Sequence, residues 1–318
     1  MENRTWPALP YAAWRDTCTN LQLRAQIVGK IRLAQTPWVN HSWHVTEYLT
    51  ARGLTTGPIP YADRVFDIEF DLLAHRLVVR VSDGATQSMP LVEQPLAEFY
   101  AALMTLLREC RLEVRIDRIP NEVPDPVRFD EDRVHRAYDA AAVERFWRAL
   151  LQIDRVFQRF RSGFLGKVSP VHFFWGSFDL AVTRFSGRPA PLLTKSAPGL
   201  PLAVAREAYS HEVSSAGFWP GGSGVDEASF YSYAYPQPAG FEKSKVVPEQ
   251  AYYHEELGQF LLPYDVVRNA SSPDDTLLSF LQSTYQAAAE SAGWDRNLEC
   301  ALGVPRVPRP LTTPPGIA

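Results

Sequence analysis

Four of the seven histidines lie in the tryptophan-centred segments or in the turn that follows the insertion predicted at residues 188–209, where they could take part in chemistry. They are His41, His44, His172 and His211. Two or three histidines with one carboxylate form a common ligand set for Zn, Fe or Mn. One hypothesis is therefore a transition-metal site. The alternative, which the sequence leaves open, is that these histidines form hydrogen bonds in an aromatic core or act as acids and bases.

The spacing of the histidines gives the metal hypothesis mixed support. His41 and His44 are three residues apart, so in a strand they would face opposite sides. Both could bind one metal only if a bend or a helical turn intervened. The sequence contains no compact metal motif such as H-E-x-x-H.

Three acidic residues accompany these segments and are the candidate catalytic groups. Glu47 follows Trp43 by four residues, and Asp179 follows Trp175 by the same number. Glu212 directly follows one of the histidines. If Glu47 and Asp179 meet in a buried site, one of them would have a raised pKa and could act as a general acid or base.

Two arginines and several aromatic residues complete the candidate site. Each arginine follows one of the paired acids by five residues, so an ion pair is an equally good interpretation of those carboxylates. The aromatic side chains could line a cleft that binds a flat or apolar molecule, although such a stripe is also typical of a core. The predicted ligand-binding residues are Trp43, Trp175, Trp219, Tyr233, Arg52 and Arg184.

The elements that must position these residues occur twice along the chain. Trp14-Arg15 followed by Gly29-Lys30 recurs as Trp147-Arg148 followed by Gly166-Lys167. A tryptophan-centred segment with strand character follows each Gly-Lys pair, at residues 41–47 and 173–179, and alternating strands come next, at residues 65–70 and 230–235. Second strands are predicted at residues 76–81 and 259–264, and closing helices at residues 96–109 and 276–292.

These repeats predict an α+β fold made of internally duplicated units. Each unit is a helix, a three-stranded antiparallel sheet and a helix, with one further strand at residues 112–116. Because one such unit leaves a sheet face or edge uncovered, we expect the two units to pack about a pseudo-twofold axis with a cleft between them.

Proline-rich segments divide the chain. Residues 1–120 form the first half, and residues 121–139 form a stiff linker. Residues 140–296 form the second half, which carries an insertion at residues 188–209 of the kind that makes lids or binding loops. Residues 297–318 are predicted to be a disordered tail.

Two long segments of the second half resemble a known family. Residues 166–179, GKVSPVHFFWGSFD, and residues 209–222, YSHEVSSAGFWPGG, are similar to those of a bacterial family of uncharacterised proteins catalogued as a domain of unknown function. The similarity extends from Trp6 to about Trp294. It implies no activity and supplies no catalytic residues, so the functional argument rests on the residues themselves.

Composition and charge narrow the class of protein. The chain has 318 residues, of which 46% are hydrophobic and 21% charged, as in ordinary globular proteins. A net charge of −4 argues against nucleic acid or an anionic membrane as the partner. No apolar run of membrane-spanning length and no secretory signal occur, and the three cysteines are widely spaced. We therefore expect a cytoplasmic protein, whose oligomeric state the sequence does not indicate.

Two functions remain open on the sequence alone. The first is an enzyme that acts on a small organic molecule in a cleft between the halves, with or without a bound metal, by oxidation or hydrolysis. The second is a non-catalytic protein that binds a small ligand or a partner through an aromatic cleft. The sequence contains no nucleophile elbow, phosphate loop or dinucleotide fingerprint.

Overall fold

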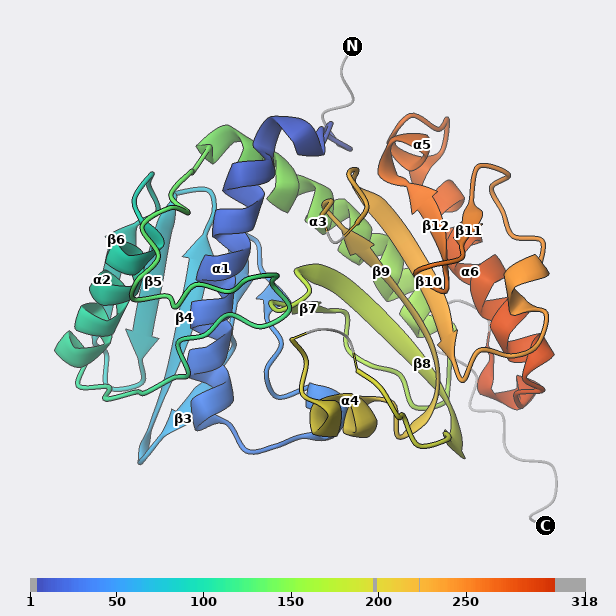
Figure 1. The fold of residues 1–318 in the computed structure, drawn as a ribbon, viewed down its shortest axis with the longest axis horizontal. Helices are drawn as coiled ribbons and strands as arrows, with labels where there is room; N and C mark the ends of the chain where they lie inside the picture. The colour runs from blue at the N-terminus through green and yellow to red at the C-terminus, as the bar shows by residue number, and fades with distance from the viewer. Residues whose placement is uncertain (1–4, 197–198, 223, 301–318) are drawn as a thin grey trace.

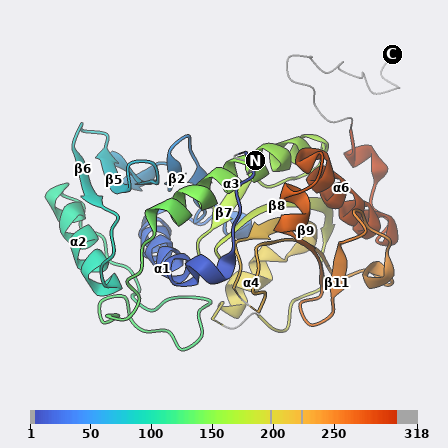
Figure 2. The ribbon, with the colours of Figure 1, turned by 90° about the horizontal axis from the view of Figure 1, so that it is seen from above.

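A computed structural model describes residues 5–196, 199–222 and 224–300. In that part of the chain the fold is mixed α and β, with two antiparallel sheets and six α-helices (Figure 1). The helices are α1 (Tyr11–Gln35), α2 (Leu96–Glu109), α3 (Ala140–Ser162), α4 (Leu202–Ala208), α5 (Tyr264–Arg268) and α6 (Pro273–Ser291). The two sheets lie at opposite ends of the molecule, as both views show (Figures 1 and 2).

The first sheet belongs to the N-terminal half. Its strands follow one another as a meander in the order β1-β2-β4-β5-β6, and β3 pairs with the far end of β4. Period-two burial along β5, with Leu77, Val79 and Val81 inside, explains why this segment forms a strand. The strands are β1 (Tyr48–Leu49), β2 (Gly53–Thr55), β3 (Ile59–Tyr61), β4 (Arg64–Asp71), β5 (Arg76–Val81) and β6 (Thr86–Pro90).

The second sheet has the strand order β11-β12-β10-β9-β8-β7, and all its pairs are antiparallel. Helices α3 and α6 pack against β8, β9 and β10, while the short helix α4 lies at the other side of this sheet (Figure 1). One sheet face is thus committed to the core and the other is available for a site. The strands are β7 (His172–Phe174), β8 (Asp179–Pro189), β9 (His211–Trp219), β10 (Ser229–Tyr235), β11 (Tyr252–His254) and β12 (Gln259–Pro263).

Helix α1 is buried on nearly all sides, including several polar residues. Two of these polar side chains hold the segment that joins the two halves. The Lys30 ammonium donates to the carbonyl of Ile119 at 2.5 Å. The Gln26 amide donates to the carbonyl of Asn121 and accepts from its N–H, both at 2.8 Å. The linker is therefore fixed to α1 rather than being a free spacer.

Most predicted elements are confirmed, and three are wrong. The helix at residues 96–109 and the alternating strands at 65–70, 76–81, 230–235 and 259–264 are present within a residue or two. The strand predicted at residues 173–179 is interrupted, because β7 ends at Phe174 and a turn at residues 175–178 leads into β8. The predicted strand at residues 41–47 is instead a 3₁₀ turn, η1 (Asn40–Ser42), in which His41 has a φ of 59°. Residues 112–116 bury Leu112 and Val114 alternately, as predicted, but they pair with no strand in the described part of the chain.

The predicted three-stranded units are corrected to two sheets of six strands each. Internal duplication stays a prediction. One continuous buried cluster contains residues of both halves, so the halves share a hydrophobic core. Residues 297–300 are folded, with Glu299 bridging to Phe164, whereas residues 301–318 of the predicted tail lie outside the described residues. No helix in the described segments is long and apolar enough to cross a membrane.

Candidate functional site

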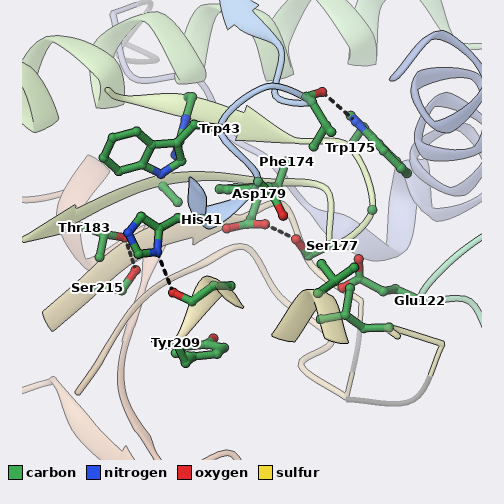
Figure 3. A pocket seen from close by; sticks show the side chains of 18 of the residues that line it. His41, Trp43, Glu122, Phe174, Trp175, Ser177, Asp179, Thr183, Tyr209 and Ser215 are labelled. Atoms are coloured by element: carbon green, nitrogen blue, oxygen red, sulfur yellow. Dashed lines mark hydrogen bonds between the residues drawn. The ribbon is translucent and has the colours of Figure 1, made fainter. Parts of the chain in front are cut away.

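A cavity of about 400 Å³ lies on the face of the second sheet that α3 and α6 leave free. This volume is in the range typical of small-molecule sites. Strands β7 to β10 form its floor, and residues of the first half, the linker and α4 form its walls (Figure 3). Both halves of the chain thus contribute to one site.

The register of the sheet explains the shape of the floor. Ala181, Gly217 and Tyr231 lie side by side on three neighbouring strands. A Cβ on Gly217 would lie 2.3 Å from the Tyr231 ring, so only glycine lets this ring lie across the strand. The Tyr231 hydroxyl thereby reaches the Asp179 carboxylate.

Asp179 is the most buried acid of the cavity, with 4% of its surface exposed. Its two carboxylate oxygens accept hydrogen bonds from Ser177 and Tyr231, respectively. Burial raises the pKa of Asp179, and the two hydroxyl donors oppose this rise by favouring the charged form. Each oxygen retains a lone pair for a ligand.

Glu122 supplies the second carboxyl of the cavity, from the linker rather than from a strand. The backbone of Glu122 lies in the left-handed region, with a φ of 55°. The hydrogen bonds between the adjacent residue Asn121 and Gln26 hold this part of the linker in place. A Cβ on Gly176 would come within 2.2 Å of the Glu122 carboxylate, so this glycine makes room for it. Burial raises the pKa of Glu122 to about 7, and the charge of Asp179 adds to the rise.

The Glu122 carboxylate has no hydrogen-bond partner within residues 5–196, 199–222 and 224–300. It differs in this from Asp179, which has two donors. The two acids therefore share one cavity but have different environments. Hydrogen bonds to the charged form favour ionisation of Asp179, and Glu122 lacks them, so the two carboxyls differ in how readily they hold a proton.

Trp175 connects the cavity to α1. Its indole lies against Gly29, where a Cβ would come within 2.1 Å of the ring, and its N–H donates to the carbonyl of Val45 at 2.8 Å. Helix α1 thus needs glycine at this position despite its cost in a helix. The hydrogen bond fixes the loop that carries Trp43 over the cavity (Figure 3).

His41 fastens α4 to the first half. Its backbone N–H donates to both carboxylate oxygens of Glu207, at 2.8 and 2.7 Å, and its Nδ1 donates to the carbonyl of Ala208 at 3.0 Å. With Nδ1 as the donor, Nε2 accepts from the Lys167 ammonium, 2.5 Å away. Burial lowers the pKa of His41, and the charge of Lys167 contributes to this.

Two buried polar atoms in the cavity wall are unsatisfied. The Nδ1 of His172 and the hydroxyl of Ser42 have no hydrogen-bond partner in the described part of the chain, and both residues line the cavity. Burial lowers the pKa of His172 to about 3, with the charges of Arg32 and Arg161 as smaller contributions. His172 is therefore neutral at physiological pH. An unsatisfied buried polar group indicates a place for water or a ligand.

The structure brings about half of the sequence-predicted residues into the cavity. Those lining it are His41, Trp43, His172, Trp175, Asp179, Trp219 and Tyr233. The predicted residues that do not line it are His44, Glu47, Arg52, Arg184, His211 and Glu212.

The expected meeting of Glu47 and Asp179 does not occur. Neither oxygen of Glu47 has a hydrogen-bond partner among the residues described, although this carboxyl is completely buried. Its backbone pairs with Phe173, which itself pairs with Leu180 and not with Asp179, and the charge that acts on its carboxyl is that of Arg32.

The alternative pairing with arginines is also wrong. Arg52 forms an ion pair with Asp71 at 2.6 Å, because Arg52 directly precedes β2 and Asp71 lies at the end of β4, where the two strands pair. Arg184 is buried on the core side of β8, where it donates to the carbonyl of Phe160 and stacks on aromatic rings. Sequence spacing alone could not reveal these partners, because they come from other strands and helices.

The four histidines do not converge on one point. The rings of His41 and His211 are 6.1 Å apart, and Nδ1 of His44 lies 3.2 Å from the N–H of Val39. Glu212 forms an ion pair with Arg188 at 2.7 Å. Across the described residues, no group of three His, Cys, Asp or Glu side chains could hold a metal ion. The predicted metal site therefore gains no support.

Sequence reasoning missed several residues of the cavity, and Glu122, Ser177 and Tyr209 are three of them. Glu122 was assigned to a linker, Ser177 to a strand without a role, and Tyr209 to the end of an insertion. The Tyr209 hydroxyl shares a hydrogen bond of 2.9 Å with that of Tyr233. The sequence feature that could have indicated Glu122 is an acidic residue in a proline-rich segment. Such segments more often indicate linkers.

Comparison with known proteins gives a family and no activity. No curated protein and no solved structure matches the chain. A family model described as a family of unknown function, DUF5996, matches residues 6–300. This match covers both sheets, the linker and every residue of the cavity. The chain therefore belongs to the family of unknown function DUF5996.

Proposed function

We propose that the protein is an enzyme that performs acid–base chemistry on a small organic molecule in the cavity. The observation that carries this proposal is the pair of carboxyls, Asp179 and Glu122, in one largely aromatic cavity. General acid–base catalysis is most effective when the pKa of the group lies near the working pH, and the pKa of Glu122 is about 7.

The different environments of the two carboxyls suggest their roles. Glu122 has no donor to stabilise its charge among the described residues, so it is the group that holds a proton and can give it to the substrate as a general acid. Asp179 receives hydrogen bonds from Ser177 and Tyr231, which favour its ionised form. It is therefore the general base, or the group that stabilises positive charge on the substrate.

This function is tested by measuring which metabolites in a mixture are consumed by the wild-type protein and by its variants. The purified protein is incubated with a small-molecule extract, and the compounds consumed are measured by mass spectrometry. We expect at least one compound to disappear with the wild-type protein, and its loss to slow by roughly 10²-fold or more in Asp179→Asn and in Glu122→Gln. Glu144→Gln, which removes an exposed carboxylate paired with Arg148, is the matched control.

Two results would count against catalysis. If a compound is retained by the protein but recovered unchanged, the cavity is a binding site and not an active site. If a compound is consumed equally by the wild type and both cavity variants, the chemistry does not depend on these carboxyls.

A further inference from the structure

Among the described residues that line it, the cavity combines acidic and aromatic side chains. Its ionisable acids are Asp179 and Glu122, and no Lys or Arg occurs among the described residues that line it. Burial lowers the pKa of its two histidines, His41 and His172, so both are neutral near pH 7. Among the described residues that line the cavity, any formal charge is therefore negative.

The part of the cavity floor formed by β9 and β10 carries aromatic rings. Trp219 and Tyr231 have ring centroids 4.4 Å apart, and Tyr233 stacks on Tyr231 at 6.0 Å. These rings lie on the same sheet face as Asp179. The faces of aromatic rings attract cations, and a desolvated cation gains more from them than an exposed one. Aromatic rings next to a buried carboxylate therefore form a site suited to binding an organic cation.

A lysine beside the cavity shows where such a cation would not bind. The Lys167 ammonium lies 5.3 Å from the centroid of the Trp43 ring and 4.9 Å from that of Phe185, and it contacts His41. Figure 3 shows His41 on one side of Asp179 and Glu122 on the other. The positive charge near His41 repels a second cation, so a ligand's ammonium group is directed toward the carboxyls.

We infer that the cavity takes an organic cation, an ammonium group joined to an apolar body, with Asp179 as its counter-ion. This inference deepens the proposed function and rests on it. The ammonium group lies at Asp179 and donates hydrogen bonds to the carboxylate lone pairs that Ser177 and Tyr231 leave free. The apolar body lies against the rings of Trp219 and Tyr231.

Three matched probes test the charge of the ligand directly. They are 2-phenylethylamine, its neutral analogue 2-phenylethanol and the anion 3-phenylpropionate, each titrated into the full-length protein by calorimetry at pH 7.5. We expect the protonated amine to bind at least tenfold more tightly than the alcohol, and the anion to bind most weakly. This ratio is measured on the wild-type protein, so it does not depend on the folding of any variant.

A pair of variants then locates the counter-ion. Asp179→Asn should remove most of the preference for the amine over the alcohol while binding of the alcohol changes less than threefold. Glu212→Gln removes a carboxylate that is paired with Arg188 outside the cavity, and the preference should remain.

Two outcomes would overturn the inference. Equal binding of amine and alcohol, or tighter binding of the anion, would mean that the cavity does not select a cation. Failure of all three probes to bind at millimolar concentration would mean that it does not take this class of ligand. Both outcomes are distinct from failure of the proposed function, because proton transfer in the metabolite assay could still depend on Asp179 and Glu122 when the amine does not bind.

Discussion

Replacing Glu47 by glutamine should change how the stability of the protein depends on pH. Glu47 is completely buried, and neither of its carboxylate oxygens has a hydrogen-bond partner in the described residues. Burial raises the pKa of Glu47 from 4.5 to about 8, and the positive charge of Arg32 opposes this only in part. A carboxyl in this environment is protonated in the folded protein and ionised in the unfolded chain near pH 7.

The pKa of Glu47 gives the sign and the size of the effect. Because the folded state binds the proton more tightly, the free energy of unfolding falls as the pH rises from about 4.5 to about 8, and is constant beyond. A rise in pKa of this size corresponds to a loss of about 5 kcal/mol in unfolding free energy across that range. Glutamine does not ionise, so Glu47→Gln should not lose this stability.

Urea denaturation followed by tryptophan fluorescence measures the effect. The free energy of unfolding is determined for the wild type and for Glu47→Gln at several pH values between 4.5 and 9. The quantity of interest is the difference between the two proteins at each pH, because a constant cost of burying the amide cancels from its pH dependence. Glu144→Gln, at an exposed position, serves as the control.

As the pH rises from 4.5 to 9, we expect the free energy of unfolding of Glu47→Gln to increase relative to that of the wild type by about 3 to 5 kcal/mol. A difference that stays constant between pH 4.5 and 9 would refute the reasoning, since it would mean that Glu47 is ionised in both states or in neither. A change in the opposite direction would mean that the folded protein stabilises the charged carboxylate.

Three further predictions follow from the cavity. Gly29→Ala should destabilise the protein by about 1–3 kcal/mol in thermal or urea unfolding, because the new methyl group meets the Trp175 ring; a gain in stability from helix propensity would contradict this contact. Tyr231→Phe should raise the pKa of Asp179 further, because it removes a hydroxyl that stabilises the charged form; ¹³C NMR of the carboxyl would detect this rise or its absence. The His172 ring should not titrate between pH 5 and 8 in NMR, and a midpoint in that range would show that it is not buried as described.

The local elements of the fold could be predicted from the sequence because their patterns are local. The helix at residues 96–109 carries apolar residues at helical spacing, and β5 alternates strictly. Residues 112–116 show the limit of this reasoning. Their side chains alternate between inside and outside as a strand would, but pairing needs a free neighbouring edge, which a single segment cannot reveal.

The candidate site could be predicted best in the segments that tryptophans mark. Trp43, Trp175 and Trp219 were identified as ligand-binding and line the cavity. Glu122 was not, because its position depends on hydrogen bonds between Gln26 in α1 and Asn121 in the linker, 95 residues apart. Long-range contacts of this kind leave no periodic signal in the sequence.

The roles of the histidines and acids were harder to predict than their positions. His41 lies at the cavity, but its backbone and ring are engaged by Glu207 and Ala208. Glu47 and Asp179 have equal spacing from their tryptophans, but a left-handed turn at residues 41–42 places the first in the core and not in the cavity. Equal spacing predicts equal positions only where the backbone conformations are equal.

The pH dependence of the reaction tests the central claim, that Glu122 and Asp179 carry out acid–base chemistry in the cavity. Once a consumed compound is identified, kcat/KM is measured from pH 5 to 9 for the wild type and Glu122→Gln. We predict that the wild-type value falls as the pH rises through about 7, where Glu122 loses its proton. The variant should be slower and should lack this fall. A variant that keeps the same rate and the same fall near pH 7 would contradict the account.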